Sequence, residues 1–600
     1  MSSHGESWFL VLPDCEAGLA VASHVETRLK RTADKQVLHA SGRPFLIGSW
    51  GPACVTTTRH GLRIAVIGCT STDEHDVAQR LAEQRDIESA TRVARSLRGE
   101  FHLVVASGGR LRVRGTASGM RRVFHGDAEG TPVASDRADV VARLLDAPLD
   151  EELLAVRLLD SVPHPLGDVP LWRGVHAVPP GFQLETGPNG VSRTRWWRPP
   201  EPRLDLEAGA ALLRTELDAA VRVRTRAAAT VSSDLSGGLD STAVCALAAA
   251  AGATPVALTM SSRDPGDDDL HWAKLAAADL DHAEHVVLPV DRVPLFYSGL
   301  LEVTGPVDEP APTILDQPRQ LAGHDEMLAR GSALHLTGMG GDHVLWGHPA
   351  HVLERLTTDP LGALRHLRGY RAHNRWSLRD ALSVVADRRP YGQWLADSAD
   401  RLTAARAAPH SADVLAWDVP PRMPGWATPD AVAAVRDRMR QAAQSAVPLG
   451  RTRARHNELN VLRHGTRVTR VLHQVAEHGG LPMASPFFDD RVIEACWSVR
   501  AEERSSPWQY KPLLKAALRG VVPAAVLERE TKGEASTDAA NGLRENRARI
   551  AELWHDSRLA RLGLVDADRL VRTTLQPSSP ELRYAGLDST LACEIWLRTT

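Results

Sequence analysis

The sequence predicts a mixed protein in which an α+β domain precedes an α/β domain. Its 600 residues are too many for one hydrophobic core, so two or more domains are expected. The first part alternates apolar and polar residues between turn residues, as β-hairpins do. The second part alternates strand-like and helix-like segments, which is typical of a doubly wound parallel sheet with ligands at its carboxyl edge. We therefore expect a β-rich domain over residues 1–200 and a parallel-sheet domain with helical additions over residues 204–600.

The composition excludes several classes of protein. A chain that is 43% hydrophobic and 24% charged is ordinary for a globular protein, and a net charge of -3 gives no attraction to nucleic acid or to membranes. The six cysteines are scattered without Cys-x-x-Cys spacing, which argues against a zinc site or a disulfide framework. The N-terminal residues lack a basic-then-apolar signal pattern, so we expect no targeting or membrane-spanning segment. We expect a cytoplasmic protein with neither nucleic acid nor membrane as a partner.

Two hairpins are expected in the first domain. Residues 101–105 and 111–114 flank the turn 107–110, whose sequence is Ser-Gly-Gly-Arg. Residues 182–185 and 191–197 flank the Gly-Pro-Asn-Gly turn at 187–190. The Pro-Pro-Glu-Pro run at 199–202 then ends regular structure, so we interpret it as the linker between domains.

The second domain begins with an amphipathic helix, expected over residues 204–226 because its apolar residues recur at helical spacing. Further strands are expected at 255–260, 285–288 and 333–336, with a helix at 268–280 between the first two. Beyond about residue 350 the chain has the Ala- and Arg-rich composition of helices.

A glycine-rich loop at residues 235–241 is the most informative motif. It follows an apolar run at 227–231, expected as a strand, and precedes a helix expected over 242–251. Glycines let the backbone approach an anion, and a helix N-terminus offers unpaired N–H groups. The pattern Ser-Gly-Gly-x-Asp-Ser resembles the pyrophosphate loop of ATP pyrophosphatases, which cleave ATP between the α and β phosphates, and it lacks the lysine of a Walker loop. The expected nucleotide-binding residues here are Leu235, Ser236, Gly237, Gly238, Asp240 and Ser241.

A second glycine cluster, Thr-Gly-Met-Gly-Gly-Asp at 337–342, follows the strand expected at 333–336. Two such loops on neighbouring strands can hold one triphosphate between them. Asp240 and Asp342 would then bind Mg²⁺, which favours one or two carboxylates together with phosphate oxygens. We assign ATP and Mg²⁺ as cofactors. The remaining nucleotide-binding residues predicted are Met260, Thr337, Gly338 and Gly340.

The sequence resembles the asparagine synthetase superfamily over nearly its whole length. The two glycine loops carry the resemblance, together with Ser-Pro-Phe-Phe-Asp-Asp-Arg at 485–491 and the segment from Lys511 to Lys532-Gly533. In the first domain, Leu-Arg-Gly-Glu-Phe at 97–101, Ala-Ser-Asp at 134–136, Val-Pro-Pro-Gly at 178–181 and Trp-Trp at 196–197 resemble the family's glutaminase domain. The resemblance implies an Ntn-type, class II glutamine amidotransferase-like domain followed by an ATP-pyrophosphatase synthetase domain. It also implies catalytic roles for Lys511 and Lys532.

Two departures from the family pattern bear on function. A class II glutaminase needs a cysteine directly after the initiator methionine, with its free amine as the base, but this sequence has Ser2 there. The first domain is therefore expected to keep the glutaminase fold without its activity. The residue after the first glycine of the second loop is Met339, where relatives carry a tyrosine or a glutamate, and a thioether cannot act as a base.

Without an ammonia source, the nucleophile is expected to belong to the substrate. Within the superfamily this fits the isopeptide-forming lasso-peptide cyclases, or macrolactam synthetases. The resemblance then implies that a side-chain carboxylate of a leaderless precursor peptide is adenylated and that the peptide's own N-terminal amine closes the ring. Lys511 would help to hold pyrophosphate, and Lys532 would stabilise the charge that develops in the transition state. A precursor peptide, a leader-recognition protein and a leader peptidase are the implied partners.

Three alternatives stay open at this point. A β-lactam synthetase-like or other small-molecule amide synthetase would keep the adenylation chemistry in a small closed pocket. A glutamine- or ammonia-dependent asparagine synthetase would need the glutaminase that Ser2 argues against. A non-catalytic peptide-binding scaffold would not need Asp240, Asp342 and Lys532, all of which are present.

Overall fold

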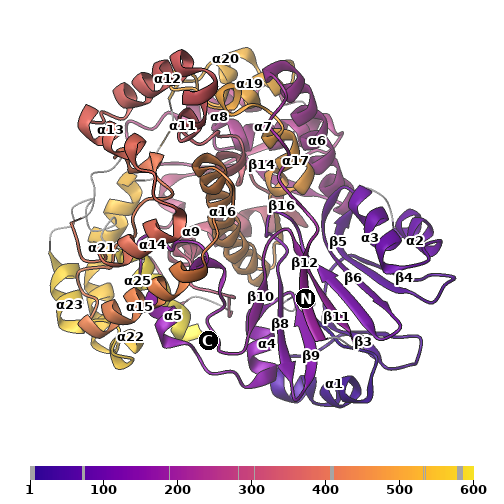
Figure 1. Ribbon diagram of the computed structural model, residues 1–600. Helices are drawn as coiled ribbons and strands as arrows, with labels where there is room; N and C mark the ends of the chain where they lie inside the picture. Colours follow the sequence, from indigo (N-terminus) through magenta and orange to yellow (C-terminus); the bar gives the residue numbers. More distant parts are fainter. Residues whose placement is uncertain are drawn as a thin grey trace.

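Two antiparallel sheets of six strands each form the N-terminal part of the protein (Figure 1). A computed structural model describes residues 7–70, 74–187, 190–280, 283–302, 305–405, 411–531, 533, 536–576 and 586–599. The first sheet has the strand order β10-β8-β9-β1-β3-β2, and the second has β12-β11-β7-β6-β5-β4. The strands are β1 (Trp8–Val11), β2 (Lys35–Leu38), β3 (Pro44–Ser49), β4 (Ala53–Thr57), β5 (Arg63–Thr70), β6 (Gly99–Ser107), β7 (Arg110–Arg114), β8 (Val123–Ala128), β9 (Thr131–Ser135), β10 (His176–Val178), β11 (Phe182–Gly187) and β12 (Gly190–Arg195).

These sheets are the middle of a four-layer α/β/β/α arrangement. Phe9 and Phe45 of the first sheet share a buried cluster with Val104 and Val113 of the second. Helices α1 and α4 share a cluster with the outer face of the first sheet, and α2 and α3 share one with the outer face of the second. Because each strand alternates its side chains between two faces, both faces of each sheet are buried. The helices are α1 (Glu16–Leu29), α2 (Glu74–Ala82), α3 (Ile87–Ser96), α4 (Ala138–Leu145) and α5 (Glu151–Val156).

Both predicted hairpins are present. β6 and β7 pair antiparallel, with Ser107 opposite Arg110 at the predicted turn. β11 and β12 pair antiparallel up to Gly187 opposite Gly190, and the two residues at the tip of this turn lie outside the described residues. The second strand ends at Arg195, two residues before the predicted end. Residues 196–203 have no helix or strand, in agreement with the predicted break at 199–202.

A five-stranded parallel sheet with the order β15-β14-β13-β16-β17 forms the centre of the rest of the chain. Helices cover both of its faces. Ala257 of β14 shares a cluster with α8, while Leu258 shares one with α9 on the opposite face. The predicted fold class, a doubly wound parallel sheet after a β-rich domain, is confirmed. The elements are α6 (Leu206–Ala227), β13 (Val231–Asp234), α7 (Leu239–Ala250), β14 (Val256–Met260), α8 (Asp269–Ala277), β15 (Glu284–Leu288), α9 (Gln317–Leu328), β16 (Leu334–Leu336), α10 (Gly341–Val344) and β17 (Met483–Ala484).

Two predictions about these elements are wrong in part, and one element was not predicted. The strand before the first glycine loop is not at 227–231, because α6 continues to Ala227 and β13 begins only at Val231. The run of alanines at 227–229 extends the helix or caps its end, in keeping with the high helix propensity of alanine. The helix predicted to end at 280 ends at Ala277. The two-residue strand β17 was not predicted, since it is too short to show a pattern.

Beyond residue 350, the regular structure of the described residues is helical, as predicted, apart from β17. The longest helix, α16 (Arg453–His478), runs through the middle of the molecule (Figure 1). Among the helices of the described residues, none is both long enough and apolar enough to span a bilayer. The other helices are α11 (His351–Thr358), α12 (Pro360–His373), α13 (Leu378–Ala386), α14 (Tyr391–Ala399), α15 (Pro429–Ser445), α17 (Asp490–Trp497), α18 (Ala501–Arg504), α19 (Pro512–Ala517), α20 (Ala524–Leu527), α21 (Ser536–His555), α22 (Arg558–Arg561), α23 (Ala567–Leu575) and α25 (Leu587–Thr599).

The N-terminal sandwich is joined to the parallel-sheet part by buried polar contacts. Arg224 of α6 forms an ion pair with Asp489 and a second, at 3.2 Å, with Glu100 of β6. One carboxylate oxygen of Asp490 accepts hydrogen bonds from the backbone N–H groups of Ala117 and Ser118 at 2.9 and 3.2 Å. The 485–491 motif that the sequence singled out therefore lies at the junction between the two parts.

Candidate active site

The first glycine-rich loop connects β13 to α7 at the carboxyl edge of the parallel sheet. Gly237 has a φ of +80°, a conformation that residues with side chains rarely adopt. A Cβ at Gly237 would lie only 2.3 Å from the carbonyl oxygen of Asp269, so α8 closes against the loop. Gly238 is the N-cap of α7, and the first turn of this helix presents backbone N–H groups that lack intrahelical partners. The loop therefore has the geometry that accepts a phosphate.

Two serines hold this loop in shape. Their hydroxyl oxygens, Oγ of Ser236 and Oγ of Ser241, lie 2.9 Å apart. The Ser241 hydroxyl also accepts a hydrogen bond from the Ser236 backbone N–H at 3.1 Å and donates one to the Gly238 carbonyl at 3.2 Å. Both serines thus support the turn, which keeps its backbone groups preorganised for a ligand.

The second loop touches the first because β16 pairs directly with β13 in parallel. A Cβ at Gly338 would lie 2.4 Å from the backbone nitrogen of Ser241, and a Cβ at Gly341 would lie 2.3 Å from Cγ of Asp240. Only glycine permits these approaches. Gly340 has a φ of +106° and lies over Phe487 of the 485–491 motif. The two loops that the sequence predicted to share one ligand are adjacent.

Lys511 bridges the two carboxylates predicted to bind metal. Its Nζ lies 2.6 Å from Asp342 Oδ1 and forms an ion pair with Asp240. Burial alone would lower the pKa of this lysine, but the attraction of Asp240 and Asp342 outweighs burial and raises the pKa above its ordinary value. Lys511 is therefore a permanent cation at the place where ATP phosphates would carry their negative charge.

The carboxylates fit the predicted Mg²⁺. Asp240 and Asp342 converge on one ammonium group, so they can also converge on one metal ion, and carboxylate oxygen is the ligand that Mg²⁺ prefers. In the part of the chain that the structure describes, no group of three or more His, Cys, Asp or Glu side chains could hold a metal. Phosphate and water would then complete the ligand set. When bound, the ion would neutralise phosphate charge and orient the triphosphate.

Arg529, which the sequence motifs did not single out, ties the C-terminal segment to the first loop. It donates hydrogen bonds to the Gly237 carbonyl at 2.9 Å and to Asp268 at 2.6 Å. Nearby, Thr531 donates to Asp268 at 2.6 Å and the Gly533 backbone N–H donates to Asp269 at 3.2 Å. The residues on both sides of position 532 are therefore anchored at the start of α8, beside the loop. Lys532 itself lies outside the described residues, as does Ser2.

The other predicted nucleotide-binding residues differ in accessibility. Leu235 is fully buried, and its backbone groups bond to Leu258 and Thr259, so it holds the start of the loop. Met260 is partly buried at the carboxyl end of β14. Thr337 is buried, and its hydroxyl accepts a hydrogen bond from the Met339 backbone N–H at 3.3 Å. Leu235 and Thr337 shape the site, whereas Met260 lies at the edge where ligands bind.

Comparison with known proteins gives one family. The asparagine synthase family model matches residues 212–598. Among solved structures, the glutamine phosphoribosylpyrophosphate amidotransferase from B. subtilis, complexed with ADP and GMP, is 8% identical with a TM-score of 0.22, covering 60% of this chain and 79% of its own. A structure described as the allosteric regulatory enzyme of purine biosynthesis is 10% identical with a TM-score of 0.21, covering 59% and 73%. These TM-scores are too low to carry a functional inference. No curated protein matches.

The two glycine loops, Lys511 and the two carboxylates are typical of an α/β enzyme that binds the phosphates of a nucleotide. The asparagine synthase match spans more than half of the chain, so the protein belongs to that family. It is therefore an ATP-dependent, AMP-forming carbon–nitrogen ligase, and the family uses ATP with Mg²⁺. The sequence-based expectation of an amide-forming enzyme of this family is confirmed.

Proposed function

We propose that the protein is a lasso-peptide cyclase that closes an isopeptide macrolactam. An Asp or Glu side-chain carboxylate of a leaderless precursor peptide attacks the α-phosphorus of ATP, and pyrophosphate leaves. The peptide's N-terminal amine then attacks the acyl-adenylate carbonyl, AMP leaves with the bonding electron pair, and the amine loses a proton as the amide forms. The net change in the peptide is the loss of one water molecule.

The observation that carries this proposal is the convergence of two glycine loops, Lys511 and two carboxylates at one edge of the parallel sheet, in a protein whose described cysteines are not suited to release ammonia. A glutaminase of this type uses a cysteine whose own free α-amine is the base. All six cysteines are internal residues: Cys15, Cys54, Cys69, Cys245, Cys496 and Cys593. Cys69 lines the cavity between the sandwich and the parallel sheet, but burial raises the pKa of its thiol, so it is not a ready nucleophile. The amine is then best supplied by the substrate.

The side chain at position 339 supports an α-amine as the attacking group. Met339 is half-buried in the second loop and carries a thioether, which cannot remove a proton. An α-amine has an ordinary pKa of about 8, so part of it is already neutral at physiological pH. The amine of a lysine side chain has a higher ordinary pKa, so it would need a base to remove its proton before it could attack. We therefore propose ring closure by the peptide's N-terminus.

Each group of residues in the site would have a separate role in binding or catalysis. The Ser236–Ser241 turn and the N-terminus of α7 would hold the departing pyrophosphate, with Lys511 as its cation. Arg529 would fix the segment that carries residue 532 against the loop, and we propose Lys532 as the cation that stabilises the oxyanion. Holding the N-terminal amine and the activated carboxylate of one peptide close together would account for much of the rate acceleration, because the reaction becomes unimolecular.

We also propose the working partners of this enzyme. A precursor peptide would arrive after a leader-recognition protein and a leader peptidase have removed its leader. Family membership supports an enzyme that forms an amide from a carboxylate and an amine. The peptide substrate and these partners rest on the departures at Ser2 and Met339.

Incubation with ATP, Mg²⁺ and a synthetic peptide tests the proposal. The peptide has an N-terminal glycine and an acidic residue seven to nine positions on. We expect AMP, pyrophosphate and a peptide lighter by one water, measured by mass spectrometry, and added glutamine should not be hydrolysed. Formation of ADP would contradict adenylation. AMP formed with aspartate or a small amino acid instead of the peptide would favour a small-molecule amide synthetase.

A further inference from the structure

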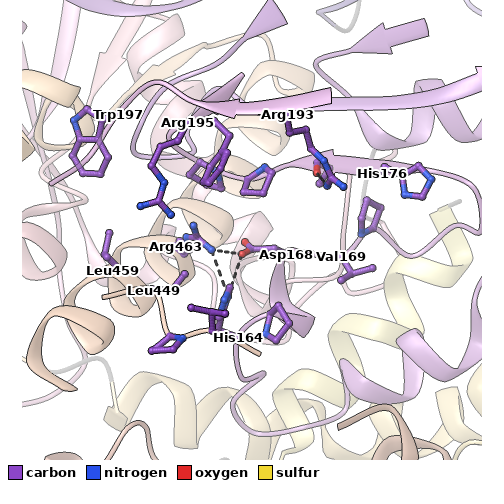
Figure 2. A pocket seen from close by; sticks show the side chains of 18 of the residues that line it. His164, Asp168, Val169, His176, Arg193, Arg195, Trp197, Leu449, Leu459 and Arg463 are labelled. Atoms are coloured by element: carbon purple, nitrogen blue, oxygen red, sulfur yellow. Dashed lines mark hydrogen bonds and ion pairs between the residues drawn. The ribbon is translucent and has the colours of Figure 1, made fainter. Parts of the chain in front are cut away.

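A cavity of about 410 Å³ lies between the N-terminal sandwich and α16, separate from the two glycine loops (Figure 2). Its walls come from the 164–180 segment, from β11 and β12, and from residues 447–449 and α16. No residue of the phosphate site lines it. A cavity of this size accommodates a few residues of peptide or a small molecule.

Most of the cavity wall is apolar. Prolines are unusually frequent in it, and Phe182 and Trp197 supply aromatic surface. The Trp197 indole N–H donates a hydrogen bond to Glu494 at 2.9 Å, which holds the ring in place. Such a rigid wall suits an extended chain, because it contacts side chains without losing much conformational freedom of its own. The prolines of the wall are Pro165, Pro170, Pro179, Pro180, Pro199 and Pro448.

The charged groups of the cavity are mostly cationic. Arg193 and Arg195 lie on one side, on β12, and face His164, Asp168 and Arg463 on the other (Figure 2). Asp168 is the only carboxylate in the lining, and it is already bound to Arg463 and lies 3.6 Å from His164. Within the described residues, neither Arg193 nor Arg195 forms an ion pair, and Arg195 lies over the Phe182 ring at 4.8 Å. The cavity therefore has unmatched positive charge.

The strand that carries these arginines is open on one edge. In the part of the chain that the structure describes, β12 is the last strand of its sheet and pairs with β11 alone, and all six of its residues are exposed. An edge strand presents free backbone N–H and C=O groups to an added peptide strand. A second hollow, which shares Arg195, Pro199 and Leu449 with the cavity, continues it along the linker. The surface is a groove rather than a closed pocket.

One helix connects this groove to the phosphate site. Leu459 and Arg463 of α16 line the groove, whereas Gly465 lies on the other side of the helix. A Cβ at Gly465 would be 2.2 Å from the His343 ring, and His343 follows Asp342 in α10. The groove and the phosphate site are therefore separated by at least one helix diameter, roughly 10 Å. At about 3.3 Å per residue, three or more residues of extended chain are needed to cover that distance.

We propose that the groove binds an acidic segment of the substrate peptide, with its carboxylates on Arg193 and Arg195 and its apolar residues on the proline wall. This inference rests on the proposed function for the nature of the occupant. It assigns to β12 a part in holding the peptide beyond the ring, a role distinct from the adenylation chemistry. Charge complementarity selects the acidic segment, since a cationic one would be repelled by Arg193 and Arg195, whereas the charge of Arg463 is matched by Asp168.

The test is a charge swap. The probe is a fluorescein-labelled peptide with an N-terminal glycine, a ring-forming glutamate and a tail that contains aspartates. Binding is measured by fluorescence anisotropy without ATP. The double substitution R193E/R195E should weaken binding about tenfold or more, because it reverses two contacting charges. A probe whose tail aspartates are replaced by lysines should bind the double variant better than it binds the wild type.

The matched control is R85E/R110E, which makes the same charge change at two exposed arginines outside the groove. It should bind the aspartate probe like the wild type. Equal binding of the aspartate probe by R193E/R195E and wild type would overturn the proposal, and so would failure of the lysine probe to recover binding. If the arginines bind the probe but no AMP forms with ATP, the docking site stands and the proposed reaction fails.

Discussion

Replacing Lys511 with methionine should lower the rate of pyrophosphate release about 1,000-fold, the effect of removing one preorganised electrostatic group. The lysine side chain is 1% exposed and is the cation between Asp240 and Asp342. Methionine has a similar length but no charge. Both carboxylates lose their partner, and water can solvate Asp342, which is 46% exposed, more readily than Asp240, which is 16% exposed. The free energy of unfolding should therefore fall by about 3–5 kcal/mol, as when one partner of a buried ion pair is removed.

Lys515→Met is the matched control for this experiment. Lys515 lies one turn further along α19, and among the described residues its ammonium group donates a hydrogen bond to the Arg529 carbonyl alone, at 3.4 Å. Pyrophosphate release by Lys515→Met should stay within a few-fold of the wild type. A Lys511→Met enzyme that adenylates at the wild-type rate while remaining folded would remove Lys511 from the proposed mechanism.

Replacing Gly237 with alanine should lower kcat/KM for ATP about 100-fold, since a displacement of about 1 Å in a catalytic loop has that effect. The new Cβ would lie 2.3 Å from the Asp269 carbonyl oxygen, which belongs to the backbone of α8 and cannot move aside cheaply. The residue must also keep a φ of +80°. The loop should therefore shift away from the position that accepts the pyrophosphate.

The Gly252→Ala variant separates the effect of the close contact with α8 from the effect of the positive φ angle. Gly252 has a φ of +84°, but a Cβ there would meet nothing within 4 Å. The free energy of unfolding of the Gly252→Ala variant should fall by about 1 kcal/mol because of the backbone conformation alone. Its kcat/KM for ATP should be unchanged. If both alanine variants lose activity equally, backbone strain explains the result, and the close approach of α8 to the loop is irrelevant.

The positions of the two glycine loops at strand ends could be predicted because their sequence pattern is local. Gly237 and Gly340 supply positive φ angles within a few residues of a strand end, and a pattern of that kind is visible in the chain. The strand expected at 227–231 was misplaced because its alanines fit a helix end as well as a strand. Burial by the rest of the molecule, which no local pattern shows, decides between the two.

Contacts between distant segments could not be predicted in the same way. Nothing in the sequence shows that Lys511 bridges Asp240 and Asp342, since the lysine lies 271 residues from Asp240. Arg529 lies within the 511–533 segment but was not singled out there, yet it binds the carbonyl of Gly237. The groove beside β12 combines segments from both parts of the chain, and its charge appears only once Arg195 and Arg463 face each other.

The transfer of ¹⁸O from the peptide to AMP tests most directly whether this site activates a peptide carboxylate. The probe is the same peptide, labelled with ¹⁸O in the side-chain carboxylate of its ring-forming residue, and the nucleotide product is analysed by mass spectrometry. Attack by the carboxylate on the α-phosphorus leaves one labelled oxygen in AMP when the amide forms. We predict AMP that carries one ¹⁸O, in proportion to the cyclic product. Unlabelled AMP, or label found in ADP or phosphate, would contradict adenylation of the peptide at the Ser236–Ser241 loop.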